Sequence, residues 1–80
     1  NMAKKVILYG TSECQWCHRT REFFKEHKIK FKDIDVGGNE KALQEMVKKS
    51  GQQGVPVVDI DGKIIVGYDE EKLREFLKIK

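Results

Sequence analysis

The pattern of hydrophobic and polar residues predicts two strands and two helices in the first half of the chain. A short apolar run within residues 4–9 predicts a buried strand, and the alternation over residues 29–36 predicts a strand with one exposed face. Residues 15–28 carry apolar residues at near-helical spacing, with charged residues on the other face, which predicts a helix. A second helix is expected between Asn39, a suitable N-cap residue, and about Ser50.

The second half of the chain predicts a hairpin followed by a helix. Residues 54–60 are expected to form a strand with Pro56 near its start, and residues 63–67 a strand that pairs with it. Asp61-Gly62 between them is the signal of a two-residue hairpin turn. Asp69 is the expected N-cap of the last helix, whose first turn is acidic.

The resulting order, β-α-β-α-β-β-α, predicts an α/β fold with a mixed sheet of four strands and three helices. The first β-α-β unit should form a right-handed parallel crossover, and the hairpin adds two antiparallel strands. The strand within residues 4–9 then lies inside the sheet, and its C-terminal end opens onto a crevice at the sheet edge.

The 80 residues are expected to form a single small domain over residues 1–80. Asn1 is expected to be a remnant of cloning, with Met2 the native start. Two cysteines in one motif cannot cross-link distant parts of a fold, so stability must come from packing. The apolar face of the first helix is expected to hold Trp16, Thr20, Phe23, Phe24 and His27. The core is expected to contain Val6, Ile7, Leu8, Phe23, Phe24, Ile29, Phe31, Ile34, Val36, Leu43, Met46, Val47, Val57, Val58, Ile60, Ile64, Ile65, Val66, Leu73, Phe76 and Leu77.

Cys14-Gln15-Trp16-Cys17 is the most informative motif, because it follows the first predicted strand and begins the first predicted helix. The unpaired N–H groups and the positive dipole end at a helix N-terminus favour the thiolate form of Cys14 over the thiol. The thiolate is the form that attacks disulfides, and two cysteines three residues apart can close a disulfide with each other. This placement predicts reversible thiol–disulfide exchange.

A metal site is the first alternative use of the C-x-x-C motif. A structural zinc ion takes four ligands, and besides the two cysteines the chain offers only His18 and His27. His18 follows Cys17 directly and would point elsewhere, while His27 lies about 15 Å farther along the helix. One chain therefore does not readily complete the site, although two chains together could hold a zinc ion or an iron–sulfur cluster.

Haem attachment is the second alternative, because the motif extended by His18 reads C-x-x-C-H. Such proteins are normally exported, and the N-terminus lacks the continuous apolar stretch of a signal peptide. Strands rich in valine and isoleucine are also atypical of a c-type cytochrome. Thiol chemistry with no bound metal is the preferred interpretation, and His18 either acts near the thiols or is a solvated helix residue.

The formal net charge of +3 is mild, and the lysines are spread along the chain without a basic stripe. Nucleic acid is therefore not an expected partner. The chain lacks an apolar stretch of membrane-spanning length, and its sparse cysteines suggest a reducing cytosol, so we expect a cytoplasmic monomer without a membrane partner. Arg19 and Arg21 add positive potential that favours anionic thiols, unless they are only surface charges.

Three segments, in this order, resemble the glutaredoxin-like branch of the thioredoxin superfamily, and the resemblance covers nearly the whole chain after Lys4. They are Tyr9-Gly10-Thr11-Ser12-Glu13-Cys14-Gln15-Trp16-Cys17-His18-Arg19, Gly54-Val55-Pro56-Val57 and Gly67-Tyr68-Asp69-Glu70. The resemblance implies a thioredoxin-type fold with helices on both faces of the four-stranded sheet. It also implies a thiol–disulfide oxidoreductase in which Cys14 is the exposed nucleophile and Cys17 the more buried resolving thiol.

The resemblance further implies a cis Val55–Pro56 bond, whereas the residues alone favour trans. A cis bond would leave the Val55 backbone free to pair with an incoming peptide or glutathione. In relatives that use glutathione, the ligand lies along the positions of Trp16, Val55-Pro56 and Tyr68-Asp69. Asp69 would then either meet the charged amine of the glutamyl group and cap the last helix, or only cap the helix.

The chain departs from the common glutaredoxin motif C-P-Y-C at Gln15 and Trp16. It also has Thr11 and Gln52 where relatives often carry cationic partners for the carboxylates of glutathione. The expected substrates are disulfide-containing or glutathionylated proteins, with no bound cofactor. Two routes of reduction stay open, by glutathione or by a thioredoxin-reductase-like flavoprotein that uses the chain as a dedicated electron donor. A dimeric iron–sulfur or metal carrier is the remaining alternative.

Overall fold

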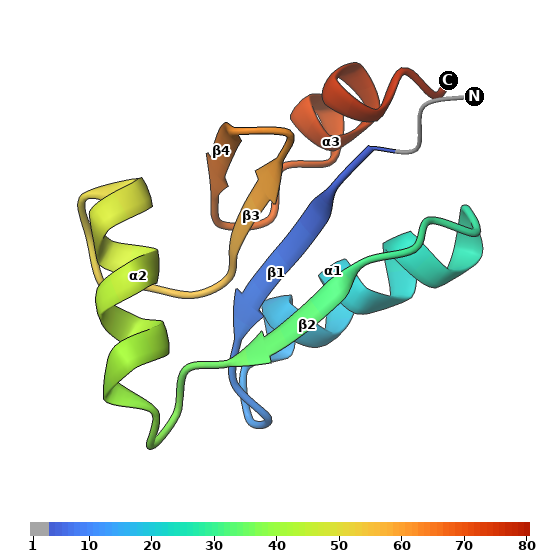
Figure 1. Ribbon diagram of the computed structural model, residues 1–80. Helices are drawn as coiled ribbons and strands as arrows, with labels where there is room; N and C mark the ends of the chain where they lie inside the picture. Colours follow the sequence, from blue (N-terminus) through green and yellow to red (C-terminus); the bar gives the residue numbers. More distant parts are fainter. Residues whose placement is uncertain (1–3) are drawn as a thin grey trace.

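A mixed sheet of four strands in the order β2-β1-β3-β4 lies at the centre of the computed structural model, which describes residues 4–80 (Figure 1). The expectation for Asn1 and Met2 concerns residues outside this range. Within residues 4–80, no helix combines the length and apolar character needed to cross a membrane. The predicted element order is confirmed, with the bounds β1 Val6–Gly10, α1 Gln15–Glu26, β2 Lys32–Asp35, α2 Glu40–Ser50, β3 Val57–Ile60, β4 Lys63–Val66 and α3 Glu70–Leu77.

β1 lies inside the sheet, as predicted. It pairs in parallel with β2 and antiparallel with β3, and β3 pairs antiparallel with the edge strand β4. The registers of these pairs bring Gly10, Pro56 and Gly67 next to one another at one end of the sheet. There the Gly67 N–H donates a hydrogen bond of 2.8 Å to the Pro56 carbonyl. The loop that carries the cysteine motif leaves β1 at this same end.

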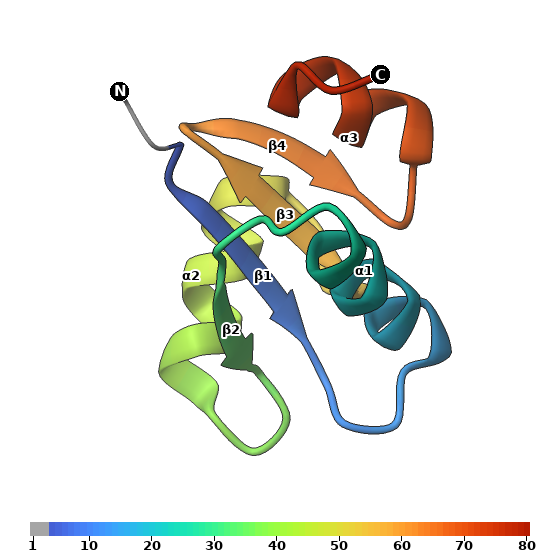
Figure 2. The same ribbon diagram turned by 90° about the vertical axis from the view of Figure 1, so that its right-hand side faces the viewer.

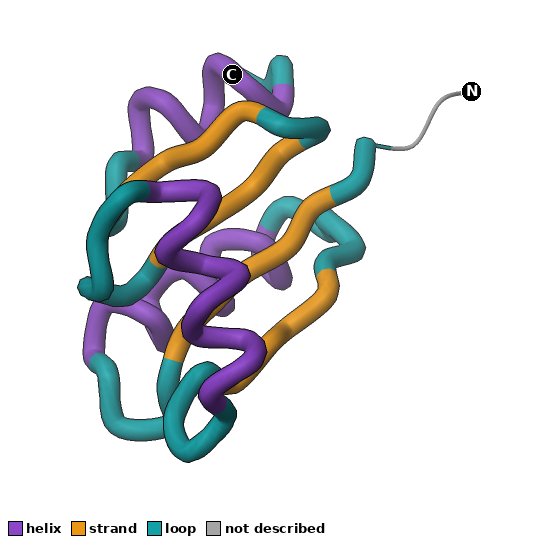
Figure 3. The backbone as a smooth tube through the Cα atoms, turned by 60° about the vertical axis from the view of Figure 1, so that its left-hand side comes forward, coloured by secondary structure: helices purple, strands orange, loops and turns teal. Residues whose placement is uncertain are grey.

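Helices cover both faces of the sheet, as the family resemblance implied (Figures 2 and 3). Successive residues of a strand point to opposite faces, so the apolar runs of β1 and β3 contribute to two cores. On one face, α1 and α3 pack over a core of Val6, Leu8, Phe23, Phe24, Val58, Ile60, Ile65, Leu73 and Leu77. On the other face, α2 packs over a core of Ile7, Tyr9, Val36, Ala42, Met46 and Val57.

The predicted caps and hairpin turn are confirmed. The side chains of Asn39 and Asp69 each accept a hydrogen bond of 3.1 Å from the backbone N–H three residues ahead. Gly51 ends α2 in the left-handed conformation, with φ of 75°. Asp61 and Gly62 have φ of 52° and 90°, and positive φ at both central residues is the requirement of a type I′ hairpin turn.

Among residues 4–80, two large apolar side chains are exposed, and of these only Val66 was expected in the core. Val66 is 52% exposed and Trp16 is 59% exposed. Val66 ends the edge strand β4, where Ile65 points into the core under α1 and α3, so Val66 points away from that core and has a neighbouring strand on one side only. Trp16 lies in the first turn of α1 and stacks on Tyr68.

The predicted strand over residues 29–36 is also too long. Only Lys32–Asp35 pairs with β1, while Ile29 and Phe31 lie before the strand and pack against the core under α1 and α3. The alternating pattern therefore identified the buried side chains of this segment but overestimated the length of the hydrogen-bonded strand.

A cluster of polar side chains lies between α2 and the sheet, and we call Tyr9, Glu45, Lys49 and Asp59 the Tyr9 cluster. Lys49 Nζ lies 2.8 Å from Asp59 Oδ2 and donates a hydrogen bond of 2.7 Å to the Tyr9 hydroxyl, which in turn donates to Glu45. Burial disfavours the charge of Lys49, but the hydrogen bonds with Asp59 and Tyr9 outweigh it and raise the pKa of Lys49 to about 12. Sequence reasoning missed this cluster, although a charged residue inside an otherwise apolar strand, Asp59, was the available signal.

Candidate active site

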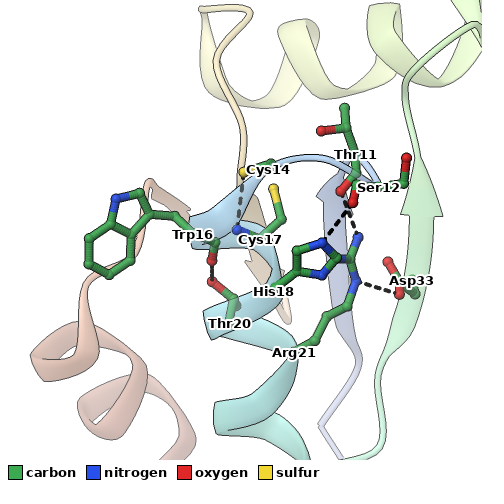
Figure 4. A network of polar contacts seen from close by, with 9 residues as sticks. All are labelled: Thr11, Ser12, Cys14, Trp16, Cys17, His18, Thr20, Arg21 and Asp33. Atoms are coloured by element: carbon green, nitrogen blue, oxygen red, sulfur yellow. Dashed lines mark hydrogen bonds and ion pairs between the residues drawn. The ribbon is translucent and has the colours of Figure 1, made fainter.

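Cys14 is the N-cap residue of α1, at the end of the loop that follows β1. Its Sγ accepts a hydrogen bond of 3.1 Å from the backbone N–H of Cys17 (Figure 4). The sulfur thus takes the place that a serine or aspartate oxygen occupies in common N-caps. Cys14 is a partly exposed free cysteine, so the N–H groups and dipole at the start of α1 act on an accessible sulfur.

Cys17 differs sharply from Cys14, because it is fully buried. Burial raises the pKa of the Cys17 thiol to about 12, and the hydrogen bond with Cys14 acts in the same direction. A hydrogen bond from the Thr11 backbone and the positive charge of Arg21 oppose this rise. The two thiols therefore differ in exposure in the sense that the resemblance implied for a nucleophile and a resolving thiol.

Gly10, the last residue of β1, leaves the space that Cys17 occupies. A Cβ atom on Gly10 would lie 2.9 Å from Cys17 Sγ and 3.3 Å from Arg21 Nη2. Carbon does not approach sulfur this closely without repulsion, so any side chain at this position would displace the buried thiol. The absence of a side chain at residue 10 therefore lets the strand end and the first turn of α1 approach closely.

Trp16 and Tyr68 form an aromatic platform that joins the start of α1 to the turn before α3. Their ring centroids lie 5.5 Å apart with an interplanar angle of 18°, which is a stacked arrangement. The Arg19 guanidinium carbon lies 5.2 Å from the centroid of the Tyr68 ring, and the Tyr68 hydroxyl donates a hydrogen bond of 3.1 Å to Glu70. Because these contacts hold Tyr68, the exposed indole of Trp16 rests on a fixed support.

The other predicted site residues come from segments that meet at the same end of the sheet. The Val55–Pro56 peptide bond is cis, as the resemblance implied and against the preference of the residues alone. Pro56 is buried and Val55 is partly exposed. The side chain of Asp69 caps α3 through the backbone N–H of Lys72, so its structural role is confirmed, and its contact with a glutamyl amine stays a prediction.

Arg21, for which the sequence left open a role near the thiols or a surface role, anchors a polar network (Figure 4). Its Nε lies 2.8 Å from Asp33 Oδ2 of β2, and its Nη2 donates a hydrogen bond of 3.3 Å to the Thr11 carbonyl. Arg21 follows Cys17 by four residues, so both lie on one face of α1, whereas its partner Asp33 on β2 was not predicted. The network ties α1 and β2 to the loop that precedes Cys14.

His18 extends this network rather than pointing freely into solvent. Its Nε2 lies 2.7 Å from the Ser12 carbonyl oxygen, and its Nδ1 lies 3.0 Å from Arg21 Nη1. A carbonyl only accepts and a guanidinium only donates, so Nε2 carries the hydrogen and Nδ1 accepts from Arg21. His18 therefore holds the loop before Cys14 through both of its ring nitrogens.

Gln52 does not present its side chain to a ligand. Its Nε2 donates a hydrogen bond of 3.1 Å to the Gly54 carbonyl, and its Oε1 accepts one of 2.7 Å from the Gly54 N–H. The side chain thus stabilises its own loop. In the part of the chain that the structure describes, no group of three or more His, Cys, Asp or Glu residues is placed to hold a metal ion.

Comparison with known proteins points to one family. The Glutaredoxin family model matches residues 6–65. The chain is 39% identical to the uncharacterized glutaredoxin-like 8.6 kDa protein in the rubredoxin operon of Clostridium pasteurianum, over 91% of this chain and 97% of that protein. It is 32% identical to Glutaredoxin 3 of Escherichia coli K12, over 81% of this chain and 78% of that protein.

Solved structures give the same result. The crystal structure of the glutaredoxin from Archaeoglobus fulgidus superimposes with a TM-score of 0.87 and 35% sequence identity. The match covers 94% of this chain and 87% of that chain. The likeness therefore extends through the sheet, all three helices and the loop that carries the two cysteines.

Proposed function

Because this chain belongs to the glutaredoxin family and is a thiol–disulfide oxidoreductase, we propose that Cys14 and Cys17 reduce protein disulfides and glutathione mixed disulfides. The observation that carries the proposal is the pair of free cysteines at the start of α1, one partly exposed as the helix cap and one buried behind it. The proposed cycle needs no bound cofactor and runs in a single chain in the reducing cytoplasm.

In the first step, the Cys14 thiolate attacks one sulfur of the substrate disulfide. A bond forms between Cys14 Sγ and that sulfur, the substrate S–S bond breaks, and the leaving thiolate takes a proton from water. The start of α1 assists this step because its N–H groups stabilise the attacking thiolate. The product is a mixed disulfide between Cys14 and the substrate.

In the second step, Cys17 loses its proton and attacks Cys14 Sγ. The Cys14–Cys17 bond forms, the mixed disulfide breaks, and the substrate leaves as a thiolate that takes up a proton. Two electrons have then passed from the cysteine pair to the substrate. Two glutathione molecules return them in the reverse sense, restoring both thiols and forming glutathione disulfide.

For glutathione itself we propose a site along Trp16, the backbone of Val55 beside Pro56, and the turn at Tyr68 and Asp69. Three features support it: the indole of Trp16 is exposed on its stacked support, Val55 is partly exposed, and all three segments meet at the end of the sheet that carries Cys14. Flat apolar and backbone contacts of this kind suit a short extended peptide.

A second candidate is a dedicated electron donor that a thioredoxin-reductase-like flavoprotein reduces. Two observations favour it: the side chain of Gln52 is engaged with its own loop, and position 11 carries a neutral threonine. Neither position then offers a charge to the carboxylates of glutathione. A dimeric metal or cluster carrier stays the third candidate.

The deciding experiment measures reduction of a glutathionylated peptide by glutathione, with glutathione reductase following product formation. We expect turnover by the wild type and none by Cys14→Ser. Serine is a good N-cap, so this variant loses the nucleophile and keeps the helix start. Cys17→Ser should retain activity on this substrate but lose reduction of a protein disulfide, which needs both thiols.

The outcomes separate the candidates. Full activity of Cys14→Ser would refute the proposal for both candidates. An inactive wild type whose Cys14–Cys17 disulfide is still reduced by dithiothreitol would favour the flavoprotein route. Brown colour after anaerobic purification, with negligible exchange, would favour the cluster carrier.

A further inference from the structure

We propose that Arg21 is a positioning residue that makes the buried Cys17 reactive in the second step, by placing a fixed positive charge beside its sulfur. The inference rests on the proposed function, in which Cys17 attacks Cys14. Arg21 touches neither the substrate nor Cys14 in this proposal. It acts through the ionisation of Cys17 and through the loop that packs against that sulfur.

The first observation is that the Arg21 guanidinium and the Cys17 sulfur adjoin the same small space. Arg21 Nη2 and Cys17 Sγ lie 3.3 Å and 2.9 Å from the single point where a Cβ atom on Gly10 would stand. The Arg21 side chain is only 15% exposed, so water screens its charge weakly. An opposite charge a few ångströms away favours the ionised form of a thiol.

The second observation is that the structure fixes this charge in place. Three acceptors on different segments hold the guanidinium: Asp33 Oδ2 on β2, the Thr11 carbonyl on the loop and His18 Nδ1 on α1. Thr11 also contacts the sulfur, because its backbone hydrogen bonds to Cys17, so one loop residue meets both the guanidinium and the buried thiol.

The third observation concerns the protonation of Cys17, which must lose its proton before it can attack in the second step. Burial and the neighbouring Cys14 hold the pKa of Cys17 far above neutral, yet only the Cys17 thiolate can attack Cys14. Cys14 and Arg21 are the titratable groups that act on this sulfur, and Arg21 is itself flanked by His18 on α1 and by Asp33 and Asp35 on β2. Arg21 is the permanent cation of this group, and its partner Asp33 is 43% exposed, so solvent moderates the negative charge that opposes it.

The test uses one equivalent of 2,2′-dithiodipyridine, an uncharged disulfide whose leaving group absorbs light. Cys14 attacks the probe and releases the first pyridine-2-thione at a rate that depends on probe concentration. Cys17 then attacks the mixed disulfide, forms the Cys14–Cys17 bond and releases the second at a concentration-independent rate. Stopped-flow absorbance at a series of pH values therefore reports the two steps separately in one protein.

For Arg21→Gln we expect the second phase at pH 7 to slow about tenfold, which corresponds to roughly one unit of thiol pKa. The deficit should shrink toward high pH, where Cys17 ionises in both proteins. Arg21→Lys keeps the charge but not the fork of hydrogen bonds, and it should recover most of the rate. Lys25→Gln, on the exposed side of the same helix, changes the net charge equally and should leave both phases unchanged.

Each outcome decides a separate question. A wild type that releases no first pyridine-2-thione would refute the role of Cys14, and one that releases only the first would refute the resolving role of Cys17. If the wild type shows both phases, a second phase of Arg21→Gln within twofold of it would overturn the inference alone. So would an Arg21→Lys variant as slow as Arg21→Gln, or a deficit equal at every pH, because both indicate lost packing rather than lost charge. Circular dichroism at each pH verifies that the variants are folded.

Discussion

Within residues 4–80, two ion pairs join a helix to a strand, one on each face of the sheet. Arg21 of α1 meets Asp33 of β2, and Lys49 of α2 meets Asp59 of β3, both at 2.8 Å. The carboxylates differ, because the side chain of Asp33 is 43% exposed and that of Asp59 only 11%. Lys49 therefore neutralises a nearly buried charge and serves stability, whereas water shares in solvating Asp33 and leaves the charge of Arg21 to act on Cys17. A pair of a cation and an aspartate thus serves stability or chemistry according to the burial of its carboxylate.

The largest effect should come from removing the cation of the buried pair. Lys49→Met leaves Asp59 without its partner, which we expect to lower the free energy of unfolding by about 3 kcal/mol. Urea unfolding measures this loss, with Lys48→Met as the matched control because Lys48 is exposed on the same turn. Both phases of the dithiodipyridine reaction should stay within twofold of the wild type. A loss below 1 kcal/mol, or a slow second phase, would contradict the division of labour between the two pairs.

A smaller effect should appear at alkaline pH. The folded protein raises the pKa of Lys49 from 10.5 to about 12, so the stabilisation by this group is complete below pH 10.5 and disappears as the pH rises toward 12. Tyr9 acts in the same sense, because burial also raises its pKa above 10.0. We expect the free energy of unfolding to fall more steeply in this window for the wild type than for Lys49→Met. Parallel pH profiles of the two proteins would show that the Tyr9 cluster is not the origin of the fall.

The smallest effect should come from neutralising the exposed carboxylate. Asp33→Asn should change stability by less than about 1 kcal/mol, as is usual for an exposed partner. The amide oxygen can still accept from Arg21, and with the opposing negative charge gone the second phase should accelerate about two- to threefold. Glu26→Gln, which removes an exposed charge near the end of α1, is the control. A slower second phase would mean that Asp33 matters for the placement of Arg21 more than for its charge.

Most of the fold could be predicted from the sequence because the signals for its elements are local. Apolar runs, alternation and cap residues each depend on neighbours within a few positions, so the element order, the turn at Asp61-Gly62 and the caps Asn39 and Asp69 were all predictable. Strand ends were less predictable, because pairing stops where the partner strand stops. The β2 ladder contains only Lys32–Asp35 even though Ile29 and Phe31 continue the apolar alternation.

The candidate site was predictable only in part. Cys14 and Cys17 stand out because a local motif places them at a helix start. Arg21 lies on the correct helical face, but β2 offers both Asp33 and Asp35, and only the register of the parallel strands decides which one meets it. The cis bond before Pro56 came from the family resemblance, since the local residues favour trans. Trp16 was assigned to an apolar face because spacing along a helix does not reveal where the sheet beneath it ends.

The cap of α1 links the oxidation state of the protein to the order of a helix. Cys14 Sγ accepts the N–H of Cys17 in the dithiol form, and a thiolate accepts more strongly than a sulfur already bonded to another sulfur. The hydrogen bond that caps α1 is therefore stronger in the reduced protein and weaker in the oxidised protein, and it changes during each catalytic cycle. Linkage makes this effect reciprocal. If reduction raises the equilibrium constant for ordering the helix by some factor, ordering the helix raises the equilibrium constant for reduction of the cysteine pair by the same factor. Any partner that binds and orders the first turn of α1 would thereby change the reduction potential of the cysteine pair without contacting either sulfur.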